Sequence, residues 1–134
     1  MPLVRIALVK GKPPAYIRAI ADGVHKALHE TYSVPPDDRF QLIDQYDPEM
    51  MIVDPTYLGI QRSRDAVIIQ IFAGNWRDMQ TKANLYRAIV DNLTADPGLR
   101  PEDVLITLSG TEKADWSFGL GKAQYVEKEL AIPR

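Results

Sequence analysis

Pro2 is the residue of this sequence with the most direct route to chemistry. An initiator Met followed by a small residue is normally removed, and removal of Met1 leaves Pro2 with a secondary amine at the head of an apolar segment. Chain-terminal amines titrate near ~7.7–8.0, so burial or a neighbouring charge can set this nitrogen as an acid or a base at neutral pH. We therefore expect Pro2 to carry the chemistry, provided that Met1 is removed.

The sequence contains few other groups of high intrinsic reactivity. It has no cysteine, and therefore no disulfide, thiolate metal site or thiol nucleophile. His25 and His29 are spaced i, i+4 on a predicted helix, which can hold a metal ion. However, the sequence has no third histidine to complete such a site, and Asp22 is the only nearby carboxylate. We predict no bound metal and no cofactor.

The composition excludes several broad classes of protein. The 134 residues suffice for one domain with a core, and contents of 46% hydrophobic and 25% charged residues are typical of globular proteins. A formal net charge of -2 argues against nucleic-acid binding, and no apolar run approaches the ~20 residues of a membrane helix. The chain enters a strand at once, unlike a secretory signal, so we expect a cytoplasmic protein.

The elements that must position Pro2 follow one pattern that occurs twice. Apolar, β-branched segments predict strands at residues 3–9 and 39–46, with an amphipathic helix between them. The same order returns with strands at 66–72 and 104–108, again separated by a helix. Both helices are predicted from apolar residues at i, i+3, i+4 and i+7 spacing: Ile17, Ile20, Ala21, Val24 and Leu28 in the first, and Leu85, Ile89 and Leu93 in the second.

A shift of 65 positions superimposes the two units. Apolar helix positions and loop residues coincide in the following pairs: Ile20 with Leu85, Val24 with Ile89, Leu28 with Leu93, Val34 with Leu99, Pro36 with Pro101, and Asp38 with Asp103. Because core positions and loop residues agree together, a duplicated β-α-β unit explains the pattern.

This duplication predicts an α+β fold. β-α-β units cross over right-handed, so the strands of each unit run parallel, and two units can share one sheet with both helices on one face. We predict a single domain over 1–134, with halves at about 2–46 and 66–109 and a C-terminal extension at 110–134. The connecting segment is compatible with a short strand at 50–53. The uncovered sheet face needs partner subunits, so we predict an oligomer.

Several strings of residues carry a resemblance to known proteins. They are the following: Pro2-Leu3, Val34-Pro35-Pro36-Asp37-Asp38-Arg39-Phe40-Gln41, the turn Gly74 to Arg77, Pro101-Glu102-Asp103-Val104-Leu105, and Ala114-Asp115-Trp116-Ser117-Phe118-Gly119. With the two β-α-β units, they resemble the tautomerase superfamily, and more narrowly the group of malonate semialdehyde decarboxylase and its relatives. The resemblance covers almost the whole chain and implies the tautomerase (MIF-like) fold and a homotrimer.

The same resemblance implies roles for particular residues. Pro2 matches the catalytic N-terminal proline, and Asp38 matches the acidic residue that holds this proline in its working state. Arg77 matches one of two arginines that bind the substrate carboxylate and polarise its carbonyl. The other arginine falls at Asn75, which carries no charge and cannot form a bidentate ion pair. Trp116 and Phe118 match the residues that form an apolar wall over the pocket in that family.

These residues leave the reaction open. If Asp38 stabilises the cationic amine of Pro2, the pKa of that amine rises. The ammonium can then polarise the carbonyl of a 3-oxo acid during decarboxylation. The unprotonated fraction of the Pro2 amine can instead attack the carbonyl and form an iminium. If desolvation and Arg77 dominate, the pKa falls and Pro2 is a general base for keto-enol tautomerisation, as in a phenylpyruvate-type tautomerase. Because Asn75 lacks charge, a non-catalytic trimeric binding module is the third alternative. We predict a cofactor-free enzyme that acts on a small oxo acid.

Overall fold

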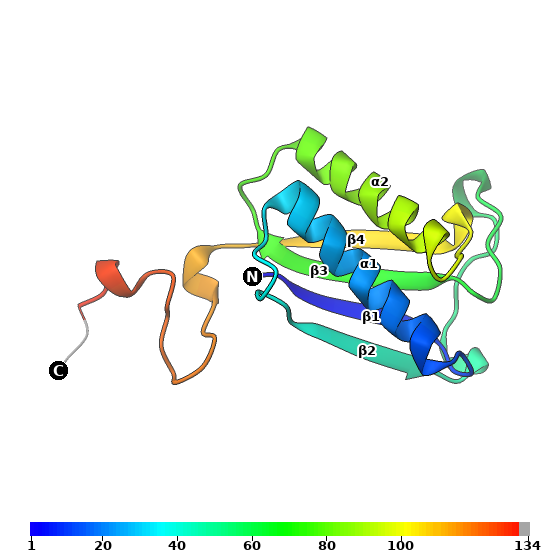
Figure 1. The fold of residues 1–134 in the computed structure, drawn as a ribbon, viewed down its shortest axis with the longest axis horizontal. Helices are drawn as coiled ribbons and strands as arrows, with labels where there is room; N and C mark the ends of the chain where they lie inside the picture. The colour runs from blue at the N-terminus through cyan, green and yellow to red at the C-terminus, as the bar shows by residue number, and fades with distance from the viewer. Residues whose placement is uncertain (132–134) are drawn as a thin grey trace.

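The computed structural model describes residues 1–131, in which two α-helices cover one face of a four-stranded sheet (Figure 1). The elements are, in chain order, β1 (Leu3–Val9), α1 (Pro14–Tyr32), β2 (Gln41–Tyr46), β3 (Val67–Gly74), α2 (Met79–Ala95) and β4 (Val104–Thr111). This arrangement confirms the predicted α+β architecture with both helices on one face. The strands β3 and β4 run a few residues further than the sequence pattern indicates.

The sheet has the strand order β2-β1-β3-β4. Each β-α-β unit pairs its own two strands in parallel, as the right-handed crossover predicts, and the two units meet along the antiparallel pair β1 and β3. Because β1 and β3 run in opposite directions, the start of β1 lies beside the end of β3. The amino end of the chain is thereby brought next to the turn that follows β3.

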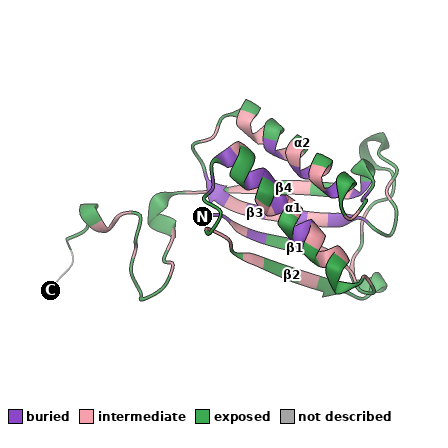
Figure 2. Cartoon of the chain, in the orientation of Figure 1, coloured by how far each residue is buried: buried purple, intermediate pink, exposed green. Residues whose placement is uncertain are grey.

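The core lies between the helices and the sheet (Figure 2). Alternate residues of β1 and β3 point toward the helices and are buried, and the predicted apolar positions of both helices meet them. The fully buried side chains include Ile6, Ile20, Leu28, Ile69, Ile71, Leu85, Ile89 and Leu93. The predicted core face of each helix is confirmed, with Ile17 only partly buried at its margin.

The duplication is also visible in the backbone geometry. Register pairs shift by 65 positions, since Ile6 pairs with Ile43 and Ile71 with Leu108. The hydrogen bond that closes the end of each unit shifts in the same way: Lys10 N donates to Tyr46 O at 2.8 Å, and Asn75 N donates to Thr111 O at 3.0 Å. The two halves therefore share one geometry, beyond their shared sequence pattern.

The segment between the halves does not form the short strand considered at 50–53. Residues Pro48–Met50 form a 3-10 turn instead, and the chain continues without regular structure to another short turn at Tyr57–Gly59. The first turn has a counterpart in the second unit at Lys113–Asp115. Met50, the first residue of the considered strand, is the last residue of this turn, and its N–H donates to Asp47 O at 2.9 Å instead of to a neighbouring strand.

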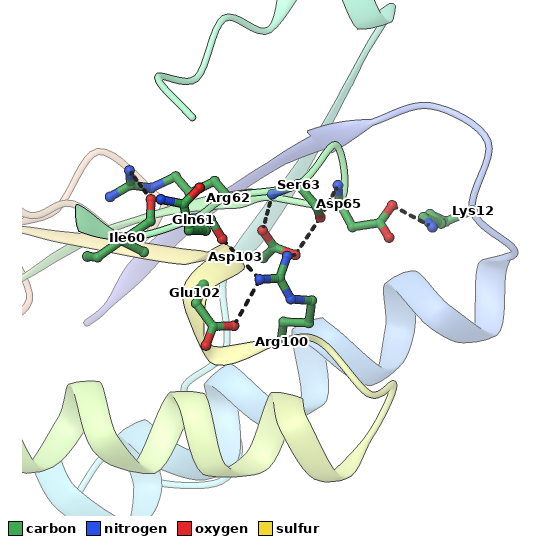
Figure 3. Close-up of polar contacts among 9 residues, drawn as sticks. All are labelled: Lys12, Ile60, Gln61, Arg62, Ser63, Asp65, Arg100, Glu102 and Asp103. Atoms are coloured by element: carbon green, nitrogen blue, oxygen red, sulfur yellow. Dashed lines mark hydrogen bonds and ion pairs between the residues drawn. The ribbon is translucent and has the colours of Figure 1, made fainter. Parts of the chain in front are cut away.

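Asp103 is a buried carboxylate, with only 1% of its surface exposed. Its two oxygens accept hydrogen bonds from Ser63 N at 2.7 Å and Ser63 Oγ at 2.6 Å, and Arg100 lies 3.7 Å away (Figure 3). These bonds fasten the segment before β3 to the turn before β4. Asp103, which corresponds to Asp38 in the repeat, thus stabilises the fold.

We expect Asp103→Ala to lower the free energy of unfolding by about 1–3 kcal/mol, because it leaves the Ser63 N–H without its buried acceptor. The adjacent Glu102→Ala is the matched control, since Glu102 is exposed and only pairs with Arg100 at 3.4 Å. Urea midpoints at one fixed protein concentration measure both effects. Equal shifts in the two variants would contradict this role for Asp103.

Two surfaces of the described chain remain uncovered. The face of the sheet opposite the helices carries apolar side chains, among them Leu42 at 49% and Leu105 at 40% exposure. The segment after β4 leaves the body of the fold as an extended arm that is largely exposed (Figures 1 and 2). No helix among residues 1–131 is both long and apolar enough to cross a membrane.

Candidate active site

The amino end of the chain is buried and lies in a polar cluster. The Met1 amine donates hydrogen bonds to Asp38 Oδ2 at 2.7 Å and to the Tyr125 hydroxyl at 2.6 Å, and Met1 is only 6% exposed. Pro2 follows directly and is buried as well. Successive residues are about 3.8 Å apart, so the Pro2 nitrogen lies within one peptide unit of this carboxylate and hydroxyl. The predicted neighbourhood of Pro2 and Asp38 is therefore present in the fold.

Asp38 reaches this position through the loop between α1 and β2. Ser33 ends α1 in the left-handed conformation (φ 57°), and the chain then turns back toward β1. Two histidine side chains of α1 hold the loop by donating to its carbonyls: His29 Nδ1 to Val34 O at 2.7 Å and His25 Nε2 to Pro36 O at 2.8 Å. These two hydrogen bonds position the loop. Within residues 1–131 there is no group of three or more His, Cys, Asp or Glu that could hold a metal ion.

Arg77 comes from the turn after β3 and faces the same cluster. Its Nη2 donates to Tyr32 O at 3.0 Å, and its guanidinium lies over the rings of Tyr32 at 4.5 Å and Trp76 at 4.6 Å. Its Nη1 is buried without a hydrogen-bond partner among the described residues. Burial lowers the pKa of Arg77, but an arginine keeps its charge at neutral pH. A fixed, charged donor with a free N–H is suited to a carboxylate.

These groups surround a cavity of about 310 Å³. The residues that line it are Met1, Ser33, Val34, Pro35, Asp38, Trp76, Arg77, Lys113 and Tyr125. Two cationic side chains, Arg77 and Lys113, face one carboxylate, so the cavity favours an anion. Its size suits a small molecule.

Tyr125 is one of the site residues that sequence reasoning missed. Its hydroxyl accepts from the Met1 amine, which leaves its own proton free for another acceptor. Burial, followed by the nearby Asp38 carboxylate, raises the pKa of Tyr125 above its ordinary value of 10.0, so it stays protonated at neutral pH. The arm has no periodicity that marks Tyr125. The available signal is the aromatic residues Trp116, Phe118 and Tyr125 in an otherwise polar segment.

Trp116 and Phe118 support Tyr125 and lie outside the set of residues that line the cavity. Their rings stack at 5.5 Å with 7° between planes, and Phe118 meets the Tyr125 ring edge-on at 5.2 Å. Trp116 Nε1 also donates to Thr111 Oγ1 at 2.8 Å, which ties the arm to the end of β4. Through these contacts the two residues fix the place of Tyr125.

Asn75 likewise lies outside the set of lining residues. It is exposed at the start of the turn after β3, and its backbone N–H bonds to β4. Trp76, which sequence reasoning also missed, lines the cavity instead. Its ring packs directly on Gly74, where an added Cβ would come within 2.1 Å of the ring. The glycine therefore allows Trp76 to lie flat and stack on Arg77.

Comparison with known proteins gives one consistent result. Two family models, each described as "Tautomerase enzyme", match residues 38–119 and 2–61. The chain is 36% identical to the "Probable tautomerase YusQ" of Bacillus subtilis (strain 168) over 127 residues, covering 95% of this chain and 100% of that protein.

Solved structures show the same likeness. A structure of FG41 malonate semialdehyde decarboxylase inhibited by 3-bromopropiolate is 44% identical, with a TM-score of 0.88 over 98% of this chain and 99% of that one. A fused 4-OT wild-type symmetric trimer shares the fold at 19% identity, with a TM-score of 0.76 over 93% of this chain and 98% of the other.

Proposed function

This chain belongs to the tautomerase family, within its malonate semialdehyde decarboxylase-like group, and on this premise we propose that it uses the free amine of Pro2 to act on a small oxo acid. The observation that carries the proposal is the burial of the amino end against Asp38 and Tyr125. Met1 is itself one of the cavity's lining residues. Its removal enlarges the cavity and gives Pro2 the terminal nitrogen.

The substrate carboxylate binds on the cationic side of the cavity. The substrate carboxylate accepts from the free Nη1 of Arg77, whose other contacts to Tyr32 and Trp76 keep the guanidinium in place. Holding one end of a small substrate in this way presents its carbonyl to the amine and orients the two groups for reaction. Tyr125 supplies a second donor for that carbonyl oxygen.

For a 3-oxo acid, this arrangement supports decarboxylation. The protonated Pro2 amine, held by Asp38, donates to the ketone or aldehyde oxygen. The bond between the carboxylate carbon and the α-carbon then breaks, and its electron pair forms the enol with the polarised carbonyl. A proton returned to the α-carbon completes the reaction, and carbon dioxide leaves.

A second reaction is supported by the relatives named as probable tautomerases. With a neutral amine, Pro2 moves a proton between carbon and oxygen of an enolisable 2-oxo acid, as in a phenylpyruvate-type tautomerase. Because Asn75 is uncharged and exposed, Arg77 is the arginine available to the substrate carboxylate in either reaction. A non-catalytic binding module predicts no turnover of either substrate class.

Turnover of malonate semialdehyde and of enol-phenylpyruvate as a function of pH tests these alternatives, after intact mass has established that Met1 is absent. Tyr125 and Arg77 keep their protons between about pH 5 and 9, so neither of these two residues causes a change of rate in that range. A rate that falls as pH rises identifies an acid, and a rate that rises identifies a base. Retention of Met1, or no turnover of either compound, would contradict the proposal.

We expect Asp38→Asn to lower kcat/KM about 10²-fold, because the amide cannot supply the charge that orients and stabilises the amine. Asp37→Asn is the matched control, since Asp37 is the exposed neighbour of Asp38 on the same loop. Steady-state kinetics on the better of the two substrates measure both variants. Equal activities in the two variants would show that Asp38 has no specific role.

We further propose a homotrimer, in which partner subunits cover the apolar sheet face left open by the helices. The fused 4-OT of the same fold is titled as a symmetric trimer. Sedimentation equilibrium on the trimmed protein gives the subunit number directly.

A further inference from the structure

We propose that the chain has a second ligand site, unrelated to the Pro2 chemistry, that binds a small carboxylate with an apolar body. It is a cavity of about 790 Å³ between the end of β1, the segment after β2 and the segment before β3. The residues around it come from three stretches of chain: 8–12, 48–55 and 62–67, with Tyr16 of α1 beside them. The proposal goes beyond the proposed function and stands without it.

The duplication makes this cavity the counterpart of the first. Because β1 and β3 are antiparallel, the end of β1 lies beside the start of β3, as the end of β3 lies beside the start of β1. The same 65-residue shift that matches the hydrogen bonds of Lys10 and Asn75 also matches the turns at 48–50 and 113–115. Under this shift four lining positions of the second cavity correspond to lining positions of the candidate active site: Gly11 to Trp76, Lys12 to Arg77, Pro48 to Lys113 and Ala66 to Met1.

Corresponding positions also carry corresponding chemistry. The shift places Lys12 where the first site has Arg77, and places Lys10 where it has Asn75. The aromatic residues of the arm likewise have apolar counterparts in the lining of the second cavity: Met51 for Trp116 and Val53 for Phe118. A cationic side chain thus lines both cavities at corresponding positions, and an apolar wall lines the second one.

The cationic side chains of the second cavity outnumber its carboxylates. Lys10, Lys12, Arg62 and Arg64 line it, against Glu49 and Asp65. Lys12 Nζ lies 2.8 Å from Asp65 (Figure 3). It also lies 5.0 Å from the centre of the Tyr16 ring, and both contacts hold it at the cavity wall. The Lys12–Asp65 pair is partly exposed and contributes little by itself, so a ligand carboxylate can share or replace Asp65 as the partner of the ammonium.

The wall on the β3 side is fixed in place. Arg62 Nη1 donates to the carbonyls of Asp54, Tyr57 and Ile60, and Ser63 is held by the buried Asp103. Apolar lining from Leu8, Val9, Met51, Val53 and Val67 accounts for the apolar body of the ligand. A cavity of this volume with a few convergent polar groups is typical of a small-molecule site.

The second cavity binds without reacting. The position that corresponds to Pro2 is Val67, whose nitrogen is a peptide nitrogen inside β3 and cannot take up or release a proton near neutral pH. The counterpart of Asp38 is Asp103, whose oxygens already accept from Ser63. The duplicated unit thus retains the features for binding an anion and lacks those for catalysis.

The test is a titration of the trimmed full chain, labelled with ¹³C in the methionine methyl groups, with hexanoate as the probe. Met51 lines the cavity, whereas Met79 is exposed at the start of α2 and is the internal reference. We expect a saturable shift of the Met51 signal and none at Met79. In Lys12→Gln, the dissociation constant should rise about tenfold or more, because the ligand loses a charge-assisted hydrogen bond.

Two controls separate the second site from the first and from nonspecific binding. Lys26→Gln removes an exposed lysine of α1 that pairs with Glu30, and Arg77→Gln disables the first site; both should leave the Met51 titration unchanged. Hexanol, which lacks the charge, should bind at least about tenfold more weakly. The proposal is overturned by no saturable shift at Met51, by equal affinities in Lys12→Gln and Lys26→Gln, or by hexanol binding as tightly as hexanoate.

Discussion

Replacing Pro2 by alanine is expected to lower kcat/KM for oxo-acid turnover about 10²-fold or more. The small side chain of alanine still allows Met1 to be removed, so the variant keeps a terminal amine at the same place. It loses the rigid secondary amine, whose ring fixes the nitrogen relative to Asp38 and the cavity. Steady-state kinetics, with intact mass to confirm removal of Met1, measure the effect.

A second variant at the same position gives a larger expected effect. In Pro2→Leu the bulky second residue retains Met1, whose side chain then stays in the cavity while the nitrogen of residue 2 remains a peptide nitrogen. We expect a loss of about 10³-fold or more, since the retained Met1 fills substrate space and its own amine takes the place on Asp38 that the Pro2 amine needs. Pro13→Ala, at an exposed proline before α1, is the control for loss of a proline elsewhere. Wild-type turnover in both Pro2 variants would refute the role of this amine.

Replacing Arg77 by glutamine is expected to lower kcat/KM about 10²- to 10³-fold, the usual cost of truncating one partner of a buried charge pair. The loss should fall mainly on KM, because the guanidinium binds the substrate carboxylate in both the ground state and the transition state. Arg77→Lys keeps the charge and loses the planar fork that stacks on Tyr32 and Trp76, so we expect an intermediate loss of about tenfold.

The control for Arg77 is Arg87→Gln, which removes an exposed arginine of α2. Because Arg77 also donates to Tyr32 O at the end of α1, the urea midpoint of each variant must accompany its kinetics. An Arg77→Gln variant with unchanged KM and a lowered urea midpoint would assign this residue to the fold and not to the substrate.

Much of the architecture was predictable from the chain alone. The period of the apolar residues decides whether a segment forms a helix or a strand, and the repeated order of segments decides how they connect. The core positions of both helices and the parallel pairing within each unit followed from this reasoning, whereas the placement of Asp38 near the amino end was implied by the resemblance. The segment at 50–53 was misjudged, because a short apolar run without a strand partner has nothing to hold it extended.

The site was only partly predictable, because some of its residues are placed by tertiary contacts and not by the repeated segments. Pro2, Asp38 and Arg77 lie in segments whose position is set by the duplicated units, so the resemblance could assign them to one place. Tyr125 and Trp76 are placed by contacts that no local pattern encodes: an aromatic stack carried by the arm, and a ring seated on Gly74. Asn75, Trp116 and Phe118 were expected at the pocket and are found beside it.

The sequence by itself thus determined the two β-α-β units, their common sheet and the residues able to do chemistry, because local periodicity and covalent order are sufficient for these. Only the tertiary structure decided which of those residues meet. The antiparallel contact of β1 with β3 brings each strand's start to the other's end, which forms one cavity at the amino end and a second at its counterpart. Contacts between residues so far apart in the chain depend on packing in three dimensions, and no spacing along the sequence specifies them.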